Sequence, residues 1–262
     1  LSRFFGFASI DKVSVGVRHT IRFTKNSFAN ILHTSLEATD AASTGNITYK
    51  DISWWVPYVK PSLASSLMLE RTLADGGQAN VSFERTNVFF RQFSDTDKTP
   101  IWSINTEDER INKVVCFLMP VGTLNDQRYN SSVFTTFNDK LSQAHIKIGS
   151  MKYPDQDFSP DFANSDYTRM YDEYLRVSDK ALDFDSGVPV SYTDFKTLYP
   201  MICFDVRHQS ENLFNQGNPI DLRIQLQFNA NPGVPYYIYA CVFSDREVKL
   251  DVVNRKMFYE VV

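Results

Sequence analysis

The sequence is poor in cysteine, which can crosslink a chain, and in glycine, which makes a chain flexible. Its 262 residues include only three cysteines and 10 glycines. The cysteines, Cys116, Cys203 and Cys241, are odd in number and widely spaced, which excludes a disulfide framework and a zinc-knuckle pattern. Each lies in an apolar stretch, so we expect three buried free thiols, which fits a reducing compartment. The low glycine content excludes a collagen-like or low-complexity chain.

The sequence also lacks long hydrophobic runs and an excess of one charge. Its longest uncharged apolar run, Val114–Val121, is far shorter than the ~20 residues of a membrane-spanning helix, so we expect no transmembrane segment. The balance of 27 Lys and Arg against 31 Asp and Glu gives a net charge of −4. This is ordinary for a soluble chain and argues against nucleic acid as a sequence-specific partner. Leu1 opens the chain with neither an initiator Met nor a secretory signal, so we expect a longer parent protein.

Motifs for catalysis and cofactor binding are missing as well. The chain contains no P-loop, no GxGxxG and no GxSxG pattern. The four histidines, His19, His33, His145 and His208, form neither HxH nor HExxH, and His19 is interpreted as a hydrogen-bonded core residue. We therefore predict no enzyme, no cofactor, and no catalytic, cofactor-binding or metal-binding residues.

Two acidic clusters are the remaining candidates for a metal-binding or catalytic site. Glu107-Asp108-Glu109 is interpreted as a solvated loop. Asp155-Gln156-Asp157, with Asp161 nearby, offers carboxylates to calcium but lacks the Gly and Glu of an EF-hand loop. We favour an exposed turn between Pro154 and Pro160. Retaining glycosidases need two carboxyl groups about 5–5.5 Å apart, and no predicted strand carries ExDxE.

Aromatic residues, in contrast, are abundant. The 21 Phe, 13 Tyr and 3 Trp require a folded core and exclude disorder. Two aromatic stretches, Ser53–Tyr58 and Tyr236–Tyr239, raise the possibility of a carbohydrate or base-stacking platform. Half of the rings on an alternating strand point inward, so we favour a role in the core or in subunit contact.

Alternation of apolar and polar residues dominates the chain and predicts strands. Ile220–Phe228 is the clearest example, and Val13–Phe23 shows the same pattern. Lys113–Val121 is continuously apolar, which predicts a strand covered on both faces. The other predicted strands are Ile47–Tyr58, Val81–Phe93, Ile101–Ile104, Ile146–Tyr153, Met201–Val206, Tyr236–Ser244, Glu247–Val252 and Met257–Val261.

Helical signals are few. Apolar residues at helical spacing over Tyr167–Leu175 predict a helix with Ser165 or Asp166 as its N-cap. A second helix is predicted over Pro61–Ala74, capped by Ser62 and ended by Gly76-Gly77. Short helical turns are expected at Val133–Leu141 and Tyr192–Leu198. Many strands with few short helices predict an all-β antiparallel sandwich.

Six short motifs occur in the order found in one known family. They are Leu1–Phe7, Val17–Asn26, Ile52–Tyr58, Ser150–Pro154, Phe204–Gln209 and Asp221–Ile224. Together they resemble the double jelly-roll major capsid proteins of Polinton/Maverick elements and related double-stranded DNA viruses. The resemblance runs over essentially the whole chain.

The resemblance implies a fold and a domain division. Residues 1–60 would be the last strands of a first, incomplete jelly roll, residues 61–78 a connector helix, and residues 79–262 a second jelly roll.

The resemblance also implies a structural function. Such proteins form homotrimers with pseudo-hexameric outlines that tile an icosahedral shell, with penton and minor capsid proteins as further partners. The expected location is the virion, after assembly in the host nucleus or cytoplasm. The loops Gly122–Ser132 and Tyr153–Tyr174 are expected to carry trimer or lattice contacts because Tyr, Phe, Met and Arg suit interface cores.

Two other functions stay open on the residues alone. One is a β-sandwich module that binds glycans or host surfaces through exposed aromatic rings. The other is a jelly-roll glycoside hydrolase whose carboxylates converge only in space.

Overall fold

The computed structural model describes residues 20–24, 48–56, 58–74, 78–106, 110–121, 133–178, 190–207, 221–251 and 256–260. The chain divides into two compact units. Unit 1 comprises Leu1–Phe28, Thr44–Arg85 and Asp245–Val262, and unit 2 comprises Ala29–Ser43 and Thr86–Ser244. The division between the units crosses two long strands, β1 (Gln78–Phe93) and β8 (Tyr236–Asp251).

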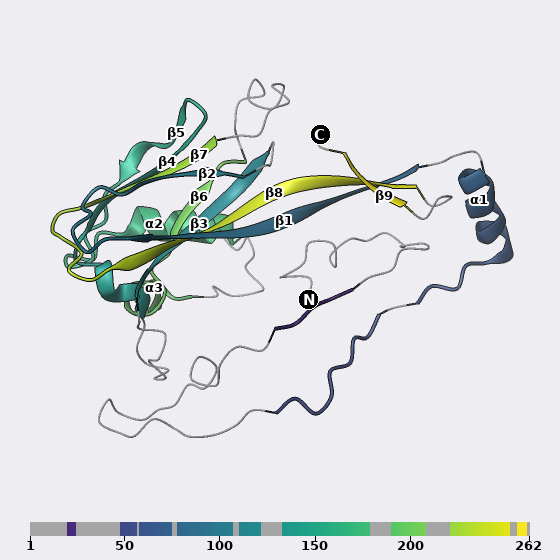
Figure 1. Ribbon diagram of the computed structural model, residues 1–262, viewed down its shortest axis with the longest axis horizontal. Coiled ribbons are helices and arrows are strands. Elements are labelled where there is room, and N and C mark those ends of the chain that lie inside the picture. The colour runs from purple at the N-terminus through teal and green to yellow at the C-terminus, as the bar shows by residue number, and fades with distance from the viewer. Residues whose placement is uncertain are drawn as a thin grey trace. The chain divides into compact units, whose positions relative to one another are not determined.

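Two antiparallel sheets form the fold, and unit 2 holds one of them entirely (Figure 1). That four-stranded sheet has the order β2-β7-β4-β5, with bounds Ile101–Asn105, Asp221–Phe228, Leu141–Ile148 and Met151–Phe158. The five-stranded sheet has the order β1-β8-β3-β6, with β9 paired to β8. Its remaining bounds are β3 Ile111–Pro120, β6 Ile202–Asp205 and β9 Lys256–Glu260.

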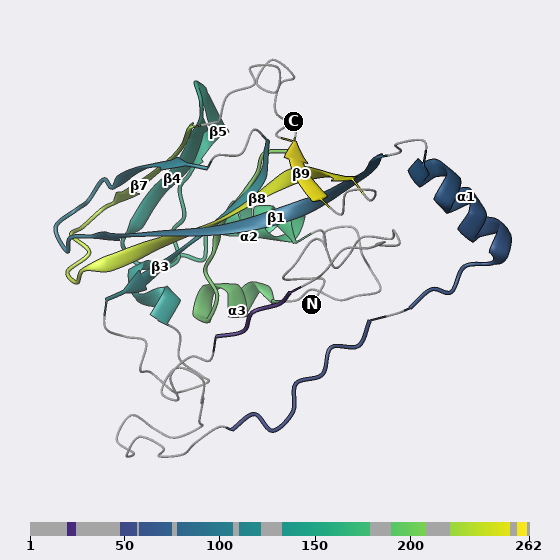
Figure 2. The ribbon, with the colours of Figure 1, turned by 45° about the vertical axis from the view of Figure 1, so that its right-hand side comes forward.

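The core of unit 2 lies between the two sheets. On β7, the alternate residues Leu222, Ile224, Leu226 and Phe228 are buried, as the alternation predicted. Across the core, the ring of Phe228 meets that of Tyr236 on β8 with centroids 5.6 Å apart. Figure 2 shows β4, β5 and β7 in one layer and β1, β3 and β8 in the other. The predicted all-β antiparallel sandwich is confirmed.

The predicted burial of the central strand on both faces is confirmed over most of β3. Val114, Cys116 and Leu118 point into the core, whereas Val115 and Phe117 on the other face are half-buried. Burial raises the pKa of the Cys116 thiol, and the nearby Cys203 and Cys241 raise it further. All three cysteines are free, as expected, although Cys241 is only half-buried.

Two strand predictions differ from the structure in their boundaries. Ile146–Tyr153 was expected to be one strand, but the chain turns at Gly149 and continues as β5. Gly149 has a φ of 57°, a conformation that glycine adopts without steric cost. Conversely, the strands expected at Tyr236–Ser244 and Glu247–Val252 are one strand, β8, because no glycine or proline interrupts its alternation.

The strand predicted at Ile47–Tyr58 is wrong over its described residues. Residues 48–56 and Tyr58 carry no strand pairing, and their side chains are exposed. Thr20–Thr24 is likewise not a strand, and the rest of the predicted strand Val13–Phe23 lies outside the described residues. Alternation alone does not make a strand, because the backbone groups need a neighbouring strand as their hydrogen-bond partner.

The helices lie where the sequence predicts them. Helix α1 (Leu63–Ala74) begins after Ser62, whose Oγ accepts a hydrogen bond from the Ser65 N–H at 3.2 Å. Helix α3 (Tyr192–Thr197) and the 3-10 turn η3 (Val133–Phe137) match the two expected short turns. The predicted domain boundaries at residues 60 and 78 stay a prediction.

Helix α2 (Thr168–Val177) has its N-cap two residues after Ser165 and one residue after Asp166, the two predicted caps. Tyr167 occupies the N-cap position and makes no side-chain capping bond. The two predicted caps belong to the preceding bend instead. The Asp166 N–H donates to the Asp161 carbonyl at 2.8 Å, and Ser165 has a φ of 61°.

We predict that Ile224→Ala lowers the free energy of unfolding by about 2–5 kcal/mol, because it opens a cavity in the close-packed core. Ile224 is 1% exposed. Chemical denaturation followed by circular dichroism measures the change.

The matched control is Gln227→Ala on the exposed face of the same strand, for which we expect a change within about 0.5 kcal/mol. Equal losses for the two variants would show that the face of β7 turned toward the other sheet is not the core.

Candidate interaction surfaces

The most distinctive surface of unit 2 is a row of aromatic rings on the outer face of the five-stranded sheet. The ring of Tyr239 on β8 lies between Phe90 on β1 and Phe117 on β3, with centroid distances of 5.7 Å and 5.0 Å. Phe134 of η3 meets Phe117 edge-on at 5.4 Å, and Tyr237 contacts Phe90 at 6.1 Å. These five residues are called the aromatic ladder.

The ladder follows from the two-residue period of β8. Within Tyr236–Tyr239, Tyr236 and Ile238 are fully buried in the core, so Tyr237 and Tyr239 point to the opposite face. Of the three rings in this stretch, only that of Tyr236 fills the core, as the alternation of the strand predicts. The Tyr236 hydroxyl donates to the Asp97 carbonyl at 3.1 Å, and burial raises the pKa of Tyr236 above its ordinary value.

The packing of the ladder indicates what it can contact. The rings of Phe117 and Tyr239 are parallel within 5°, so each covers a face of the other. Binding of bases by stacking requires ring faces that are open to a ligand, and in the ladder one face each of Phe117 and Tyr239 is covered by the other ring. Phe90 remains 64% exposed, so the ladder presents apolar surface to solvent. Exposed apolar patches of this kind mark protein contact sites.

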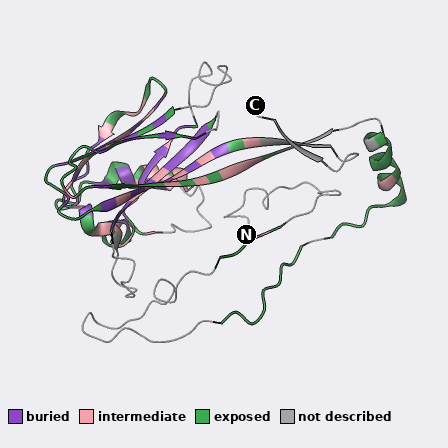
Figure 3. Cartoon of the chain, in the orientation of Figure 1, coloured by how far each residue is buried: buried purple, intermediate pink, exposed green. Residues whose placement is uncertain are grey.

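Unit 1 carries a second exposed apolar surface, the unit 1 apolar segment, which runs from Tyr49 to Leu69 (Figure 3). Trp55 and Tyr58 are each 91% exposed, and Met68 on α1 is 74% exposed. For the stretch Ser53–Tyr58, the described residues therefore contradict a place in the core. A role in subunit contact stays a prediction.

The predicted contact loop Tyr153–Tyr174 is mostly regular structure, namely β5, a bend and α2. Its aromatic rings pack internally: Tyr167 stacks on Tyr192 of α3 with centroids 4.3 Å apart. Tyr174 and Met170 are buried. Its role in trimer contacts stays a prediction, and the other predicted contact loop, Gly122–Ser132, lies outside the described residues.

Helix α2 protects the edge of the five-stranded sheet. It packs beside β6, the edge strand, and Glu173 Oε1 accepts a hydrogen bond from the Asp205 N–H at 2.8 Å. Arg207 forms a bidentate ion pair with the Asp205 carboxylate, with Nε donating to Oδ1 and Nη2 lying 2.6 Å from Oδ2. An edge strand with free backbone groups invites pairing with another chain, and this contact occupies one backbone N–H of β6.

The acidic cluster at Asp155–Asp157 lies in a strand rather than in the predicted turn, although Asp155 and Gln156 are exposed as expected. These residues belong to β5, where the register against β4 is irregular. Asp157 Oδ1 lies 2.7 Å from Lys152 Nζ and 3.1 Å from His145 Nδ1. Asp161 instead accepts two hydrogen bonds from Asn164, which lower the pKa of its carboxyl group.

Among the candidate residues that the structure describes, His145 and Asp157 are brought within 3.1 Å of each other, but no third candidate joins them. The described residues contain no group of three or more His, Cys, Asp or Glu side chains placed to hold a metal ion. His19, His33, His208 and Glu107–Glu109 lie outside the described residues. Among the described helices, none is both long enough and apolar enough to cross a membrane.

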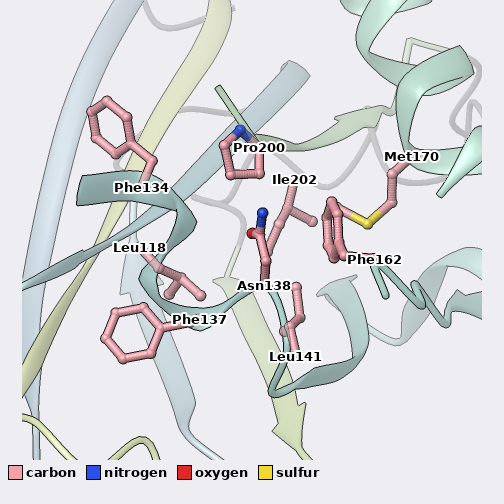
Figure 4. A pocket seen from close by; sticks show the side chains of 9 residues that line it. All are labelled: Leu118, Phe134, Phe137, Asn138, Leu141, Phe162, Met170, Pro200 and Ile202. Atoms are coloured by element: carbon pink, nitrogen blue, oxygen red, sulfur yellow. The ribbon is translucent and has the colours of Figure 1, made fainter. Parts of the chain in front are cut away.

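One internal cavity lies between η3, α2 and the core (Figure 4). Its volume is about 10 Å³, which is barely room for one water molecule. Asn138 is the polar side chain at its wall, and its Nδ2 donates to the Lys196 carbonyl at 2.9 Å. The cavity is a packing defect rather than a binding site.

Sequence reasoning found Tyr237 and Tyr239 but missed Phe90, Phe117 and Phe134. The alternation of Tyr236–Tyr239 signals an aromatic outer face. The neighbours of that face, Phe90, Phe117 and Phe134, lie 103 to 149 residues before Tyr237 and Tyr239 in the sequence. No fixed spacing links them to β8, so only the pairing of strands reveals them.

The class of protein follows from these features: an antiparallel β-sandwich with aromatic residues on the outer face of one sheet. The chain belongs to the double jelly roll-like domain family, whose model matches residues 1–248. The predicted jelly-roll fold is thereby confirmed. A comparison with curated protein sequences found no significant match.

The chain is also similar to chains in three solved structures, one of a virophage and two of viral major capsid proteins. The Sputnik virophage structure matches with 12% identity and a TM-score of 0.43, covering 71% of this chain and 39% of that chain. The mavirus major capsid protein matches with 11% identity and a TM-score of 0.35, covering 70% and 41%. The major capsid protein P2 of bacteriophage PM2 matches with 13% identity and a TM-score of 0.29, covering 63% and 45%. The chain thus spans less than half the length of these structures.

We predict that Glu173→Gln unfolds at a higher temperature than the wild type at pH 7. Burial raises the pKa of Glu173 above its ordinary value of 4.5, so folding favours the protonated form. The wild type therefore loses stability as the pH rises from about 4.5 through the folded pKa, a loss that Gln does not suffer. Thermal unfolding across pH 4–8 measures both curves, which should converge at low pH.

The paired variant is Glu173→Ala, which removes the acceptor for the Asp205 N–H and should cost about 1–3 kcal/mol. If the Ala variant is as stable as the Gln variant at pH 7, the hydrogen bond to β6 contributes nothing.

Proposed function

We propose that the chain is part of a structural capsid protein, a shell subunit without catalytic activity. The observation that carries the proposal is the aromatic ladder, an exposed apolar surface held on the outer face of a rigid sheet. Membership in the double jelly roll-like domain family and the six-motif resemblance to major capsid proteins support it. The unit 1 apolar segment is a second surface that association would remove from water.

The physics of the ladder suits permanent assembly. Its rings already support one another through contacts of 5.0–6.1 Å. A partner that covers them therefore immobilises few side chains on binding, which keeps the entropy cost of association low. Obligate interfaces bury roughly 2,000 Å² or more and resemble a domain core, as an aromatic sheet face does.

The finer proposal follows the resemblance. The subunit forms homotrimers with pseudo-hexameric outlines, and these tile an icosahedral shell with penton and minor capsid proteins. Its location is the virion, and its source is an element of the Polinton/Maverick type or a related double-stranded DNA virus.

The alternatives have weaker support in the described residues. A glycan platform built on the ladder would need open ring faces, but Phe117 and Tyr239 cover each other. A glycoside hydrolase would need two free carboxyl groups about 5–5.5 Å apart, but Asp157 is held by Lys152 and His145.

We predict that the purified chain runs as a trimer in size-exclusion chromatography with light scattering, and shows hexagonal outlines by negative-stain microscopy. Phe90→Glu should convert the trimer to monomer, because it places a charge in an apolar interface. Phe90 is 64% exposed, so the fold should survive, and thermal unfolding checks this.

The matched control is Tyr199→Glu, an exposed aromatic residue outside the ladder, which should leave the trimer intact. A trimer that persists in Phe90→Glu would remove the ladder from the interface. A wild type that stays monomeric at all concentrations and binds neutral glycans would favour the binding-module alternative.

A further inference from the structure

Three cations lie in one row across the outer face of the four-stranded sheet. Lys147 on β4 pairs with Lys152 on β5 and with Arg223 on β7. Residues paired across strands point to the same face, and the flanking Ile146, Ile148, Leu222 and Ile224 are buried, so the three cations point outward. At a strand spacing of about 4.8 Å, the row spans roughly 10 Å.

This row is unfavourable for the chain alone. Like charges directly opposite each other in a sheet repel. Two carboxylates offset part of the repulsion: Asp157 lies 2.7 Å from Lys152, and Asp221 lies 3.7 Å from Arg223. Lys147, the half-buried centre of the row, has no ion-pair partner among the residues that the structure describes. An anion over Lys147 would complete the row.

A hollow of about 170 Å³ lies next to the row on the same face of the sheet. The hollow lies over the part of the sheet where β7 pairs with β4. There, His145 Nε2 lies 2.6 Å from Gln225 Oε1. Amide and hydroxyl groups both donate and accept hydrogen bonds, which is what hydroxyl groups of a ligand require. The polar residues that line it are Thr99, Gln143, His145, Gln225 and Gln227, and the apolar ones are Ile101 and Leu226.

We propose that this face binds an acidic saccharide. The carboxylate or sulfate of the sugar lies over Lys147, between Lys152 and Arg223, and its hydroxyl groups enter the hollow. The site is separate from the aromatic ladder, which lies on the other sheet, so the proposal goes beyond a role in the shell and does not depend on it.

The chemistry of the hollow favours a sugar over a nucleic acid strand. A nucleic acid site combines a basic groove with aromatic rings on which bases stack. The residues that line this hollow carry amides, a hydroxyl, an imidazole and two aliphatic side chains, without a Phe, Tyr or Trp ring. The hollow is also small beside the 300–1,000 Å³ of drug-sized pockets, about right for one ring of a longer oligosaccharide.

The test measures binding to the full chain by isothermal titration calorimetry with four probes: sialyllactose, a sulfated heparin disaccharide, neutral lactose and a ten-nucleotide single-stranded DNA. We expect at least one acidic sugar to bind at least about tenfold more tightly than lactose or the DNA, as a single charge-assisted contact supplies. Lys147→Gln should lose that advantage. Lys60→Gln, an exposed lysine of unit 1, should keep it.

Thermal unfolding separates lost binding from lost folding. Lys147→Gln removes like-charge repulsion, so its Tm should equal or exceed that of the wild type while binding falls. The acidic sugar should raise the Tm of the wild type and leave that of Lys147→Gln unchanged. The proposal is overturned if neither acidic sugar binds, if lactose or the DNA binds equally well, or if Lys147→Gln binds like the wild type.

Discussion

Burial of alternate strand residues between the two sheets is the constraint on which the rest of this structure depends. The ring of Tyr236 on β8 contacts Phe228 on β7 and Phe137 of η3. One side chain therefore links the two sheets and the 3-10 turn η3. With a two-residue period, each side chain that enters the core forces its neighbours outward. The core therefore dictates the surface on both faces of the sandwich.

The two outer faces acquire opposite character from this one rule. On the five-stranded sheet, burial of Tyr236 and Ile238 turns Tyr237 and Tyr239 outward, and they become part of an apolar contact surface. On the four-stranded sheet, burial of Leu222 and Ile224 turns Arg223 and Gln225 outward beside the cations and amides of β4. One face suits association with protein, and the other suits polar, anionic ligands.

Prediction from sequence succeeded where local residues decide the structure. The alternation of β7 and the Ser62 cap of α1 are local signals, and both lie where expected. Prediction failed where a residue or strand distant in the sequence decides the local structure. The stretch Ile47–Tyr58 alternates like a strand, but its described residues have no neighbouring strand. Asp157 was expected in an exposed turn, but it is half-buried and its carboxylate contacts Lys152 and His145.

The sequence by itself determined the class of fold, the three free thiols and most element positions, because hydrophobic periodicity and capping act over a few residues. Only the tertiary structure decided which surfaces form. The ladder joins Phe90, Phe117 and Tyr239, and the cation row joins Lys147, Lys152 and Arg223, through strand pairings distant in sequence. Strand register sets these neighbours, and register depends on how two whole sheets bury their inner faces against each other.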